Sequence, residues 1–425
     1  MTKQKKVRVL VVPSDRTGVG FFRSTNPHIA LERSYPDEFH CDIDYEPDLN
    51  NDNFLKQYDI IHYHRTLGQY ENIETLNKKL RELGIVSIMD LDDYWAPGLH
   101  HPAYHLIKNA KLDEKIINNL RLAEHVTTTT SIFAKEINKY NKNTFVLPNA
   151  IDTNEKQFIP NLEPSNGRLR VGWLGGSSHL KDLQILEGVV SKLKSDGLLD
   201  KVQFVLCGFD LRGTHTDIDP VSKQQRTRPI TPMESVWYQY EKIFTANYTS
   251  ISPEYKDFLL KFKEGEYQNI SNEPYRRVWT KPITTYATNY NLFDVSLAPI
   301  EENIFNKVKS QLKVIEAGFH KKAIIAQDFG PYQIDIKNAM VYGGGFDETA
   351  NGILVTKANN HKDWYGAIKK LINNPELVSV LQKNLNNTIK DLYSADKVAS
   401  DRRDYYHSLL KNKKKLHTLS AEITA

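Results

Sequence analysis

The feature that most constrains the fold is a repeated alternation of short apolar, β-branched runs with segments of helical periodicity. Residues 7–12 (VRVLVV) and 58–64 (YDIIHYH) are runs of the buried-strand type. Residues 71–84 lie after them, place apolar residues at helical spacing and end on Gly84, a residue that suits a helix C-terminus. Strands joined by helices of this length form βαβ units, which require a parallel sheet.

This alternation occurs twice along the 425 residues, a length that exceeds one ordinary core. Residues 155–167 (EKQFIPNLEPSNG) contain two prolines and no periodicity, which predicts an interdomain linker. We therefore predict an α/β chain with two doubly wound, Rossmann-like domains that face a cleft. The first series continues with expected helices at 115–125 and 131–140 and strands at 85–93, 126–130 and 144–152. Ser131 is the expected N-cap of the helix at 131–140. The second series has expected helices at 183–197 and 307–319 and strands at 169–176, 202–208, 291–300 and 322–327.

The expected boundaries follow from these patterns. They are 1–155 for the first domain, 156–167 for the linker, 168–394 for the second domain and 395–425 for a C-terminal helical segment. Residues 209–272 have few strand signals and many charged and aromatic residues, which predicts a helical insertion with an aromatic core, an acceptor-shaping role or an oligomer contact. The C-terminal segment is polar and basic, and either crosses back to the first domain or stays solvated.

Composition narrows the class of protein. The formal charge of +4 is a mild basic bias that tolerates an anionic ligand but does not by itself indicate nucleic acid. Cys41 and Cys207 are far apart, so neither a disulfide framework nor a metal-type spacing is expected. No apolar run is long enough for a signal peptide or a membrane span, and we expect a soluble, cytoplasmic protein without stable membrane insertion. The sequence leaves the oligomeric state open.

The segment VGWLGGSSHLKDL, at residues 171–183, is a strand that ends in a loop before a helix. Gly175 and Gly176 lack the Cβ atoms that would keep a ligand away from the backbone, and the following helix start offers free N–H groups to an anion. Ser177, His179 and Lys181 add donors and charge. A phosphate or diphosphate fits this loop; the alternative is a tight turn that needs glycine for packing alone.

A second candidate lies at residues 307–319 (KVKSQLKVIEAGF). On one helix, Lys309, Lys313 and Glu316 fall on one face, with Ser310 nearby and an apolar stripe behind. Two cations near the helix start and a carboxylate two turns later suit a diphosphate and a sugar hydroxyl. The alternative is a solvated Lys/Glu face. Position favours the ligand site, because this helix and the Gly-Gly loop both follow strands of one domain, where α/β folds bind ligands.

Polar residues also follow strands in the first domain. The run DLDDYW supplies Asp92 and Asp93, which we expect to line an acceptor pocket and to orient or deprotonate a hydroxyl; a metal site is the alternative. HYHR places His64 and Arg65 at another strand end, and a loop adds His100 and His101 as acceptor-side candidates. GVGFFRS contributes Gly18, Gly20 and Arg23 as a loop that faces the donor phosphates, or a turn with a surface arginine.

Four motifs in this order resemble the GT-B glycosyltransferases, and within them the retaining family 4 enzymes that use nucleotide-sugar donors. FVLPNAID resembles the strand and exit at the domain boundary, RVGWLGGSSHLKDL the phosphate loop, SLAPIEENIFNKVKSQLKVIEAGFHKKAIIA the donor-site helix, and GVGFFRS the glycine-containing loop at the cleft. The resemblance spans nearly the whole chain apart from residues 209–272.

The resemblance implies roles for single residues. Glu316 matches the second glutamate of the family's paired-glutamate motif, which binds the nucleotide ribose, and Lys181 matches the lysine of the phosphate loop. The loop's usual arginine is absent, and Val308 stands where the first glutamate is expected; Lys309 is the substitute cation. The resemblance further implies metal independence and retention of anomeric configuration.

The expected activity is transfer of a sugar from a nucleotide-diphosphate sugar, of UDP or GDP type, to an acceptor hydroxyl, with no bound cofactor and no metal. The acceptor is a glycan, a small molecule or modified DNA. Two alternatives remain open at this point: a phage-type transferase that acts on a modified DNA base, and an inactive nucleotide or sugar-phosphate binding protein.

Overall fold

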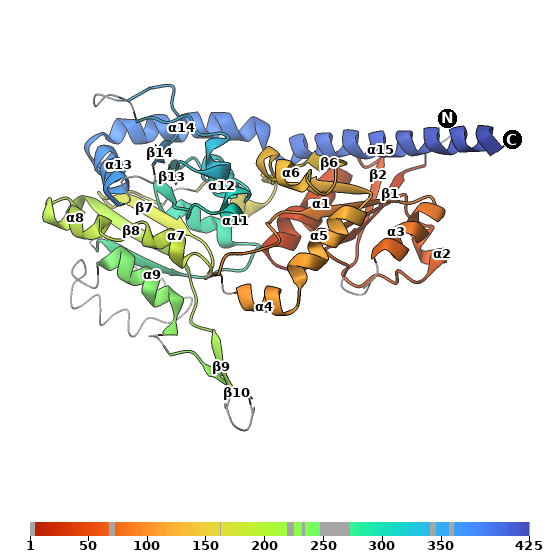
Figure 1. Ribbon diagram of the computed structural model, residues 1–425. Coiled ribbons are helices and arrows are strands. Elements are labelled where there is room, and N and C mark those ends of the chain that lie inside the picture. Colours follow the sequence, from red (N-terminus) through yellow and green to blue (C-terminus); the bar gives the residue numbers. More distant parts are fainter. Residues whose placement is uncertain are drawn as a thin grey trace. The chain divides into compact units, whose positions relative to one another are not determined.

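A computed structural model of the chain describes residues 5–67, 73–99, 101, 103–161, 163–218, 225–231, 234–246, 273–340, 346–356 and 361–424. The chain forms two compact units (Figure 1). Unit 1 comprises Met1–Glu155, Asn303–Ile315 and Ile389–Ala425, and unit 2 comprises Lys156–Glu302 and Glu316–Thr388. Unit 1 therefore includes a short segment around residue 310 that the sequence pattern assigns to the donor domain.

Unit 1 is built on a six-stranded parallel sheet in the order β2-β1-β3-β4-β5-β6. Strands β3 and β4 are buried along their whole length, which explains why their sequences are nearly continuous apolar runs. The strands are β1 (Val7–Val12), β2 (Phe39–Ile43), β3 (Ile60–His64), β4 (Val86–Leu91), β5 (His125–Thr128) and β6 (Thr144–Val146).

Helices bury both faces of this sheet. One apolar cluster joins the sheet to α3, α5 and α6, and another joins β1 and β3 to α1 and α15 through Leu31, Tyr406 and Leu409. The C-terminal helix thus packs on unit 1 rather than staying solvated. The helices are η1 (Gly20–Thr25), α1 (Asn26–Ser34), α2 (Asp52–Leu55), α3 (Ile73–Glu82), α4 (Tyr104–Asn109), α5 (Leu112–Leu122), α6 (Ser131–Ile137), α11 (Ile304–Lys307) and α15 (Ala395–Thr424).

The N-cap expected at Ser131 is wrong by one position. Thr130 has extended backbone angles, and its hydroxyl accepts a hydrogen bond from the Phe133 N–H at 3.1 Å. The polar run TTTTS ends in two candidates, Thr130 and Ser131, and only Thr130, which lies outside the helical turn, has the geometry to cap it.

Unit 2 contains a second six-stranded parallel sheet, in the order β11-β8-β7-β12-β13-β14. Its strands are β7 (Leu169–Leu174), β8 (Val202–Phe209), β11 (Tyr275–Trp279), β12 (Val295–Ala298), β13 (Ala323–Gln327) and β14 (Ile353–Val355). Its helical segments are η2 (Lys156–Phe158), α7 (Leu180–Gln184), α8 (Val189–Ser195), η3 (Leu199–Lys201), α9 (Val236–Thr245), η5 (Tyr286–Leu292), η6 (Gly330–Gln333) and α13 (His361–Asn373), while α12 (Leu312–Phe319) and α14 (Pro375–Leu392) each contain a boundary between the units.

The single helix expected over 183–197 is two helices. Gly188, which precedes α8 as its N-cap, has a φ of +100°, a left-handed conformation that interrupts the helix. The apolar spacing continues across the break because both helices cover the same sheet, which hides the break from a periodicity argument.

The insertion is only partly helical, so the prediction for it was incomplete. Its described part contains an antiparallel ribbon of β9 (Thr214–Ile218) and β10 (Gln225–Pro229), then helix α9. Residues 247–272 lie outside the described residues. Helix α9 has no aromatic core of its own, since Trp237, Tyr240 and Phe244 join the main core of unit 2.

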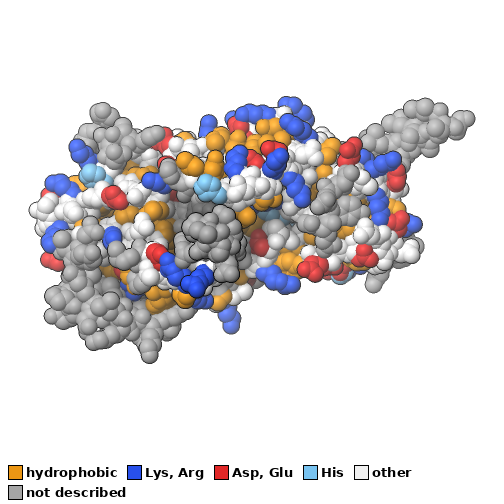
Figure 2. All heavy atoms as spheres, turned by 60° about the horizontal axis from the view of Figure 1, so that its bottom comes forward, with side chains coloured by type: hydrophobic (Ala, Val, Ile, Leu, Met, Phe, Trp, Pro, Cys, Tyr) orange, Lys and Arg blue, Asp and Glu red, His pale blue; other side chains and the backbone are white. Residues whose placement is uncertain are grey.

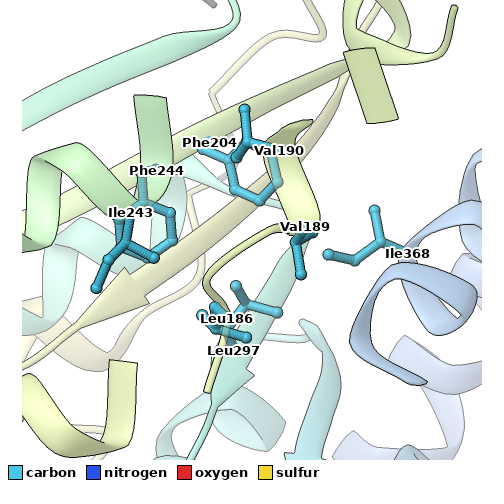
Figure 3. Close-up of a pocket in the computed structure, with 8 residues that line it drawn as sticks. All are labelled: Leu186, Val189, Val190, Phe204, Ile243, Phe244, Leu297 and Ile368. Atoms are coloured by element: carbon cyan, nitrogen blue, oxygen red, sulfur yellow. The ribbon is translucent and has the colours of Figure 1, made fainter. Parts of the chain in front are cut away.

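The core of unit 2 contains a small apolar void among its described residues. Helices α8 and α9 meet the sheet around an apolar void of about 10 Å³ (Figure 3). Such a volume holds no more than one water, and its walls offer only hydrocarbon. The lining residues are Leu186, Val189, Val190, Phe204, Ile243, Phe244, Leu297 and Ile368.

Each sheet has a point where its strand order reverses. In unit 1 the chain passes from β1 to β2 on one side and to β3 on the other, and in unit 2 the reversal lies between β7 and β12. Ligands of open α/β sheets bind beyond the carboxyl ends of the strands at such points. The prediction of an α/β chain with two doubly wound parallel sheets is confirmed. Among the helices of the described residues, none has the length and apolar character needed to cross a membrane.

Candidate functional site

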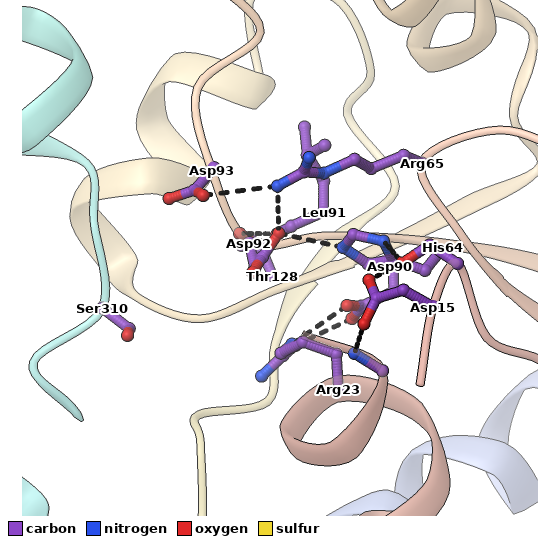
Figure 4. Close-up of polar contacts among 12 residues, drawn as sticks. Asp15, Arg23, His64, Arg65, Asp90, Leu91, Asp92, Asp93, Thr128 and Ser310 are labelled. Carbon is purple, nitrogen blue, oxygen red and sulfur yellow. Dashed lines mark hydrogen bonds and ion pairs between the residues drawn. The ribbon is translucent and has the colours of Figure 1, made fainter. Parts of the chain in front are cut away.

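Four of the predicted acceptor-side residues come together at the carboxyl ends of β3 and β4, beside the reversal point of unit 1 between β1 and β3 (Figure 4). His64 ends β3, Arg65 follows it, and Asp92 and Asp93 follow β4. Because β3 and β4 are paired in parallel, their carboxyl ends lie side by side. Topology thus unites residues that are almost 30 positions apart in the sequence.

Asp92 is the centre of this cluster. Its Oδ1 lies 2.9 Å from His64 Nε2 and accepts a hydrogen bond from Arg65 Nη2, also at 2.9 Å. The same Arg65 nitrogen lies 3.3 Å from Asp93 Oδ2. On its other side, the His64 ring contacts the Ser14 hydroxyl at 2.9 Å, which links the cluster to the segment after β1.

The two aspartates have different electrostatic environments. Desolvation opposes the charge on Asp92, but the Arg65 guanidinium and the His64 imidazole outweigh it and hold the pKa of Asp92 well below its usual range. Desolvation and the neighbouring Asp92 charge together raise the pKa of Asp93. Carboxylates whose pKa values are pushed apart are suited to different roles: Asp92 as a fixed anion and Asp93 as a group that exchanges a proton.

Arg65 adopts a strained conformation to reach both aspartates. Its φ is +58°, in the left-handed region that residues with a Cβ rarely occupy. The backbone is held there by a hydrogen bond from the Arg65 N–H to the Asp90 carbonyl at 2.9 Å. Strain of this kind clusters at functional sites.

Arg23 does not have the role predicted for it. Its side chain is 1% exposed and forms two hydrogen bonds with Asp90, at 2.9 and 2.7 Å. Its remaining nitrogen, Nη1, donates to the Leu147 carbonyl and to Asn149 Oδ1, both at 2.9 Å. A guanidinium so fully engaged inside unit 1 holds the sheet edge together and is not available to a diphosphate.

The glycine-containing segment around Gly18 is likewise not a loop. From Gly18 onward the chain is helical, and η1 starts at Gly20. A Cβ at Gly20 would lie 1.9 Å from the Asp15 carbonyl oxygen, so this glycine is required by packing. The structure therefore differs from both expectations for this segment, a loop that faces phosphates and a turn with a surface arginine.

The helix predicted over 307–319 begins only at Leu312, and this separates Lys309 from Glu316. Lys309 and Ser310 belong to unit 1. Ser310 accepts a hydrogen bond from Asn149 Nδ2 at 3.0 Å, and the Lys309 charge acts on Asp93, whose pKa it lowers. Lys309 is therefore a neighbour of the acceptor-side cluster and not part of a shared helix face with Glu316; Lys313 lies in the first turn of α12.

His101 also lies in this region, with its ring 5.2 Å from that of Phe305. Both burial and the Lys309 charge lower the pKa of His101. His100 lies outside the described residues.

The Gly-Gly loop of unit 2 follows β7, at the reversal point of its sheet. A Cβ at Gly175 would lie 2.5 Å from the Trp173 ring, so packing alone requires this glycine. At Gly176 the space above the backbone is open, and Gly176, Ser177 and Lys181 are exposed. Packing therefore explains Gly175, whereas Gly176 leaves room for a ligand beside the backbone. Helix α7 has just five residues, so its dipole adds little.

Two residues that sequence reasoning did not assign to the loop hold it in place. The Tyr240 hydroxyl accepts a hydrogen bond from the His179 N–H at 2.8 Å and donates one to the Gly176 carbonyl at 3.3 Å. Asp182 Oδ2 lies 2.7 Å from His179 Nδ1. The three-residue spacing of His179 and Asp182 in a helical segment is the one sequence signal that could have indicated this pair.

Glu316 lies on α12 in unit 2 and is buried. Its Oε2 accepts a hydrogen bond from the Tyr290 hydroxyl at 2.8 Å, and its Oε1 accepts one from Tyr286. No local sequence pattern indicated these tyrosines, which lie 26 and 30 positions upstream.

The arginines beside the insertion form ion pairs within unit 2. Arg277 pairs with Glu241 of α9, and Arg276 with Glu163, each at 2.7 Å. On the coloured part of the face in Figure 2, basic and acidic side chains intermingle. Such a surface differs from the single-sign stripe that is typical of nucleic-acid binding. In the part of the chain that the structure describes, no three His, Cys, Asp or Glu side chains come together as a metal site requires.

Comparison with known proteins finds no matching family model and no matching curated sequence. Solved structures match over nearly the whole chain. A glycosyltransferase from Rickettsia africae has a TM-score of 0.58 at 14% identity, with 96% of this chain and 100% of that chain covered. The catalytic domain of starch synthase IV from Arabidopsis thaliana, bound to ADP and acarbose, has a TM-score of 0.58 at 11% identity, with 96% and 99% covered.

HepE from Anabaena, in complex with UDP, has a TM-score of 0.55 at 13% identity, with 95% of this chain and 100% of that chain covered. A likeness at such low identity is a likeness of fold. The chain has the two-domain fold of the GT-B glycosyltransferases, as the sequence motifs predicted.

Proposed function

We propose that this chain is a glycosyltransferase that moves a sugar from a nucleotide-diphosphate sugar to an acceptor hydroxyl. The observation that carries the proposal is the whole-length likeness to glycosyltransferases, combined with polar clusters at the reversal point of each sheet. Similar proteins have been solved with UDP, with UDP-glucose and with ADP, which supports a nucleotide diphosphate as the leaving group here.

The donor is assigned to unit 2. The open backbone at Gly176, with Ser177, His179 and Lys181, meets the diphosphate, and Glu316 binds the ribose. As the glycosidic bond breaks, the diphosphate gains negative charge, which the Lys181 ammonium and the loop N–H groups stabilise. The donor is expected to be of UDP or GDP type.

The acceptor is assigned to the cluster of unit 1. Asp92, held ionised by Arg65 and His64, orients the acceptor, and Asp93 accepts the proton of its hydroxyl. Retention of the anomeric configuration and independence of metal follow from the resemblance to family 4. The acceptor class is a glycan or small molecule, with modified DNA as a further test substrate.

The first test is thermal unfolding of the chain with UDP, GDP, ADP, CMP and their sugar conjugates. A ligand at about 100 times its Kd stabilises by roughly 2.7 kcal/mol, a readily measured change in midpoint. We expect a shift with one nucleotide and its loss in Glu316→Ala, with an unchanged circular dichroism spectrum. Nucleotide release from the matching sugar donor, measured with glycan, lipid and modified-DNA acceptors, then identifies the reaction.

The outcomes separate the remaining interpretations. Binding of a nucleotide without release from any sugar donor would favour an inactive binding protein. Transfer only to DNA would identify a base-modifying enzyme. If no nucleotide shifts the midpoint, the Gly-Gly loop is structural and the proposal fails.

A further inference from the structure

The carboxylate of Asp182 connects the two chain segments at the reversal point of unit 2. Asp182 lies in α7, beyond the carboxyl end of β7, and its Oδ1 accepts a hydrogen bond from the backbone N–H of Glu301 at 2.7 Å. Glu301 lies in the segment that follows β12. Strands β7 and β12 are paired neighbours, and the chain order reverses between them. The bond therefore joins the two segments that border the place where an open α/β sheet binds its ligand.

The second oxygen of the same carboxylate fixes an imidazole. Asp182 Oδ2 lies 2.7 Å from His179 Nδ1, and the His179 backbone is held separately by Tyr240 at 2.8 Å. The Trp173 ring packs edge-on to the imidazole, with the ring centroids 5.7 Å apart. Backbone, ring nitrogen and ring face are thus all held, which leaves the imidazole little freedom of orientation.

Burial makes this arrangement costly unless it has a role. Asp182 is only 5% exposed, and a buried carboxylate beneath a loop that is proposed to take a diphosphate repels that ligand unless a cation lies between them. The imidazole bonded to that carboxylate through Nδ1 belongs to His179, which lies on the loop itself. An apolar side chain at position 182 would pack the turn without this repulsion.

We infer that Asp182 is the positioning residue of the donor site, which holds His179 toward the leaving diphosphate and fixes the distance between the segments after β7 and β12. This inference rests on the proposed function, because it takes the ligand of the Gly-Gly loop to be a nucleoside diphosphate. Asp182 itself contacts no substrate and acts through His179 and the Glu301 N–H.

The substitution Asp182→Asn tests the contact with His179 separately from the hydrogen bond with the Glu301 N–H. An amide keeps one oxygen to accept from the Glu301 N–H but presents NH₂ to His179, which loses its carboxylate partner. Asp196→Asn is the matched control, because it removes the same charge from unit 2 at a site after α8, where Asp196 pairs with Lys192 and Lys369 and accepts a hydrogen bond from Tyr365. His179→Gln and the double variant Asp182→Asn/His179→Gln complete a cycle that measures coupling.

The experiment is isothermal calorimetry with whichever of UDP, GDP and ADP the wild-type chain binds, followed by kcat and KM with its sugar conjugate. We expect Asp182→Asn to keep its circular dichroism spectrum, to bind the nucleotide about tenfold more weakly and to lose more in kcat than in KM. Adding His179→Gln to Asp182→Asn should change affinity less than twofold, because the two residues act as one unit. Asp196→Asn should match the wild type.

Two failures are distinguishable. If the wild type binds none of the three nucleotides, the proposed donor site falls and the role of Asp182 within it falls too. If the wild type binds a nucleotide and Asp182→Asn leaves affinity and kcat unchanged, the proposed function stands and the Asp182 inference is overturned. Full multiplication of the two single effects in the double variant would also overturn it, since the residues would then act independently.

Discussion

Replacement of Arg23 by methionine separates a structural role from a ligand-binding role. The substitution removes four hydrogen bonds. It leaves Asp90, whose side chain is 0% exposed, with a hydrogen bond from the Thr127 hydroxyl at 2.6 Å and with His62 Nε2 at 3.9 Å. Loss of one partner of a buried ion pair costs about 3–5 kcal/mol. For a unit of about 200 residues, each kcal/mol moves the midpoint by roughly 2–4 °C, so Arg23→Met should lower the Tm by about 6–20 °C.

Differential scanning calorimetry measures the shift, and calorimetric titration with the bound nucleotide tests the ligand role. We expect the Tm to fall and nucleotide affinity below the transition to stay within twofold of the wild type. Arg23→Met combined with Asp90→Leu should recover part of the loss, because no unpaired charge remains buried. An unchanged Tm with a tenfold loss of nucleotide affinity would refute the reasoning and restore Arg23 to the phosphate site.

Three further predictions test the loop and the carboxylates. Gly175→Ala should destabilise unit 2 because its Cβ meets Trp173, whereas Gly176→Ala should fold normally and bind nucleotide more weakly; thermal unfolding with and without ligand distinguishes them. Asp93→Asn should lower turnover more than donor affinity. Because the pKa of Asp93 is raised in the folded chain, its ionisation destabilises the fold as pH rises above the ordinary range of an aspartate, so Asp93→Asn should raise the Tm relative to wild type at pH 8 and lose that advantage near pH 4. EDTA should leave sugar transfer unchanged, and loss of activity that Mn²⁺ restores would contradict metal independence.

The parallel sheets and the acceptor-side cluster follow from the sequence because they depend on strand order. Once β3 and β4 are recognised as parallel neighbours, their terminal residues must meet, which brings His64 to Asp92. The same argument could not show that Arg23 is buried, since its partner Asp90 was read as part of an aspartate run. A guanidinium beside glycine residues has the same sequence pattern whether it binds a phosphate or an internal carboxylate.

The donor helix shows a different limit. Periodicity across residues 307–319 suits one helix, but helix α12 begins only at Leu312, and Val308 packs in the core of unit 1. The hydrogen bond from Tyr290 to Glu316 joins residues 26 positions apart, and the one from Glu301 to Asp182 joins residues 119 positions apart. Such contacts depend on packing between segments, which the local sequence pattern does not encode.

The division of the chain between its units has a consequence for its synthesis. The core of unit 1 includes Tyr406, whose hydroxyl lies 2.8 Å from His28 Nε2, a contact between residues 378 positions apart. Residues 1–155 are synthesised before unit 2, but their sheet lacks its covering helix until α15 has been made. Part of the apolar face of unit 1 therefore stays exposed while unit 2 is synthesised, a state that is prone to aggregation. A truncation that ends before Tyr406 should therefore yield insoluble chain even though the candidate acceptor residues are all present.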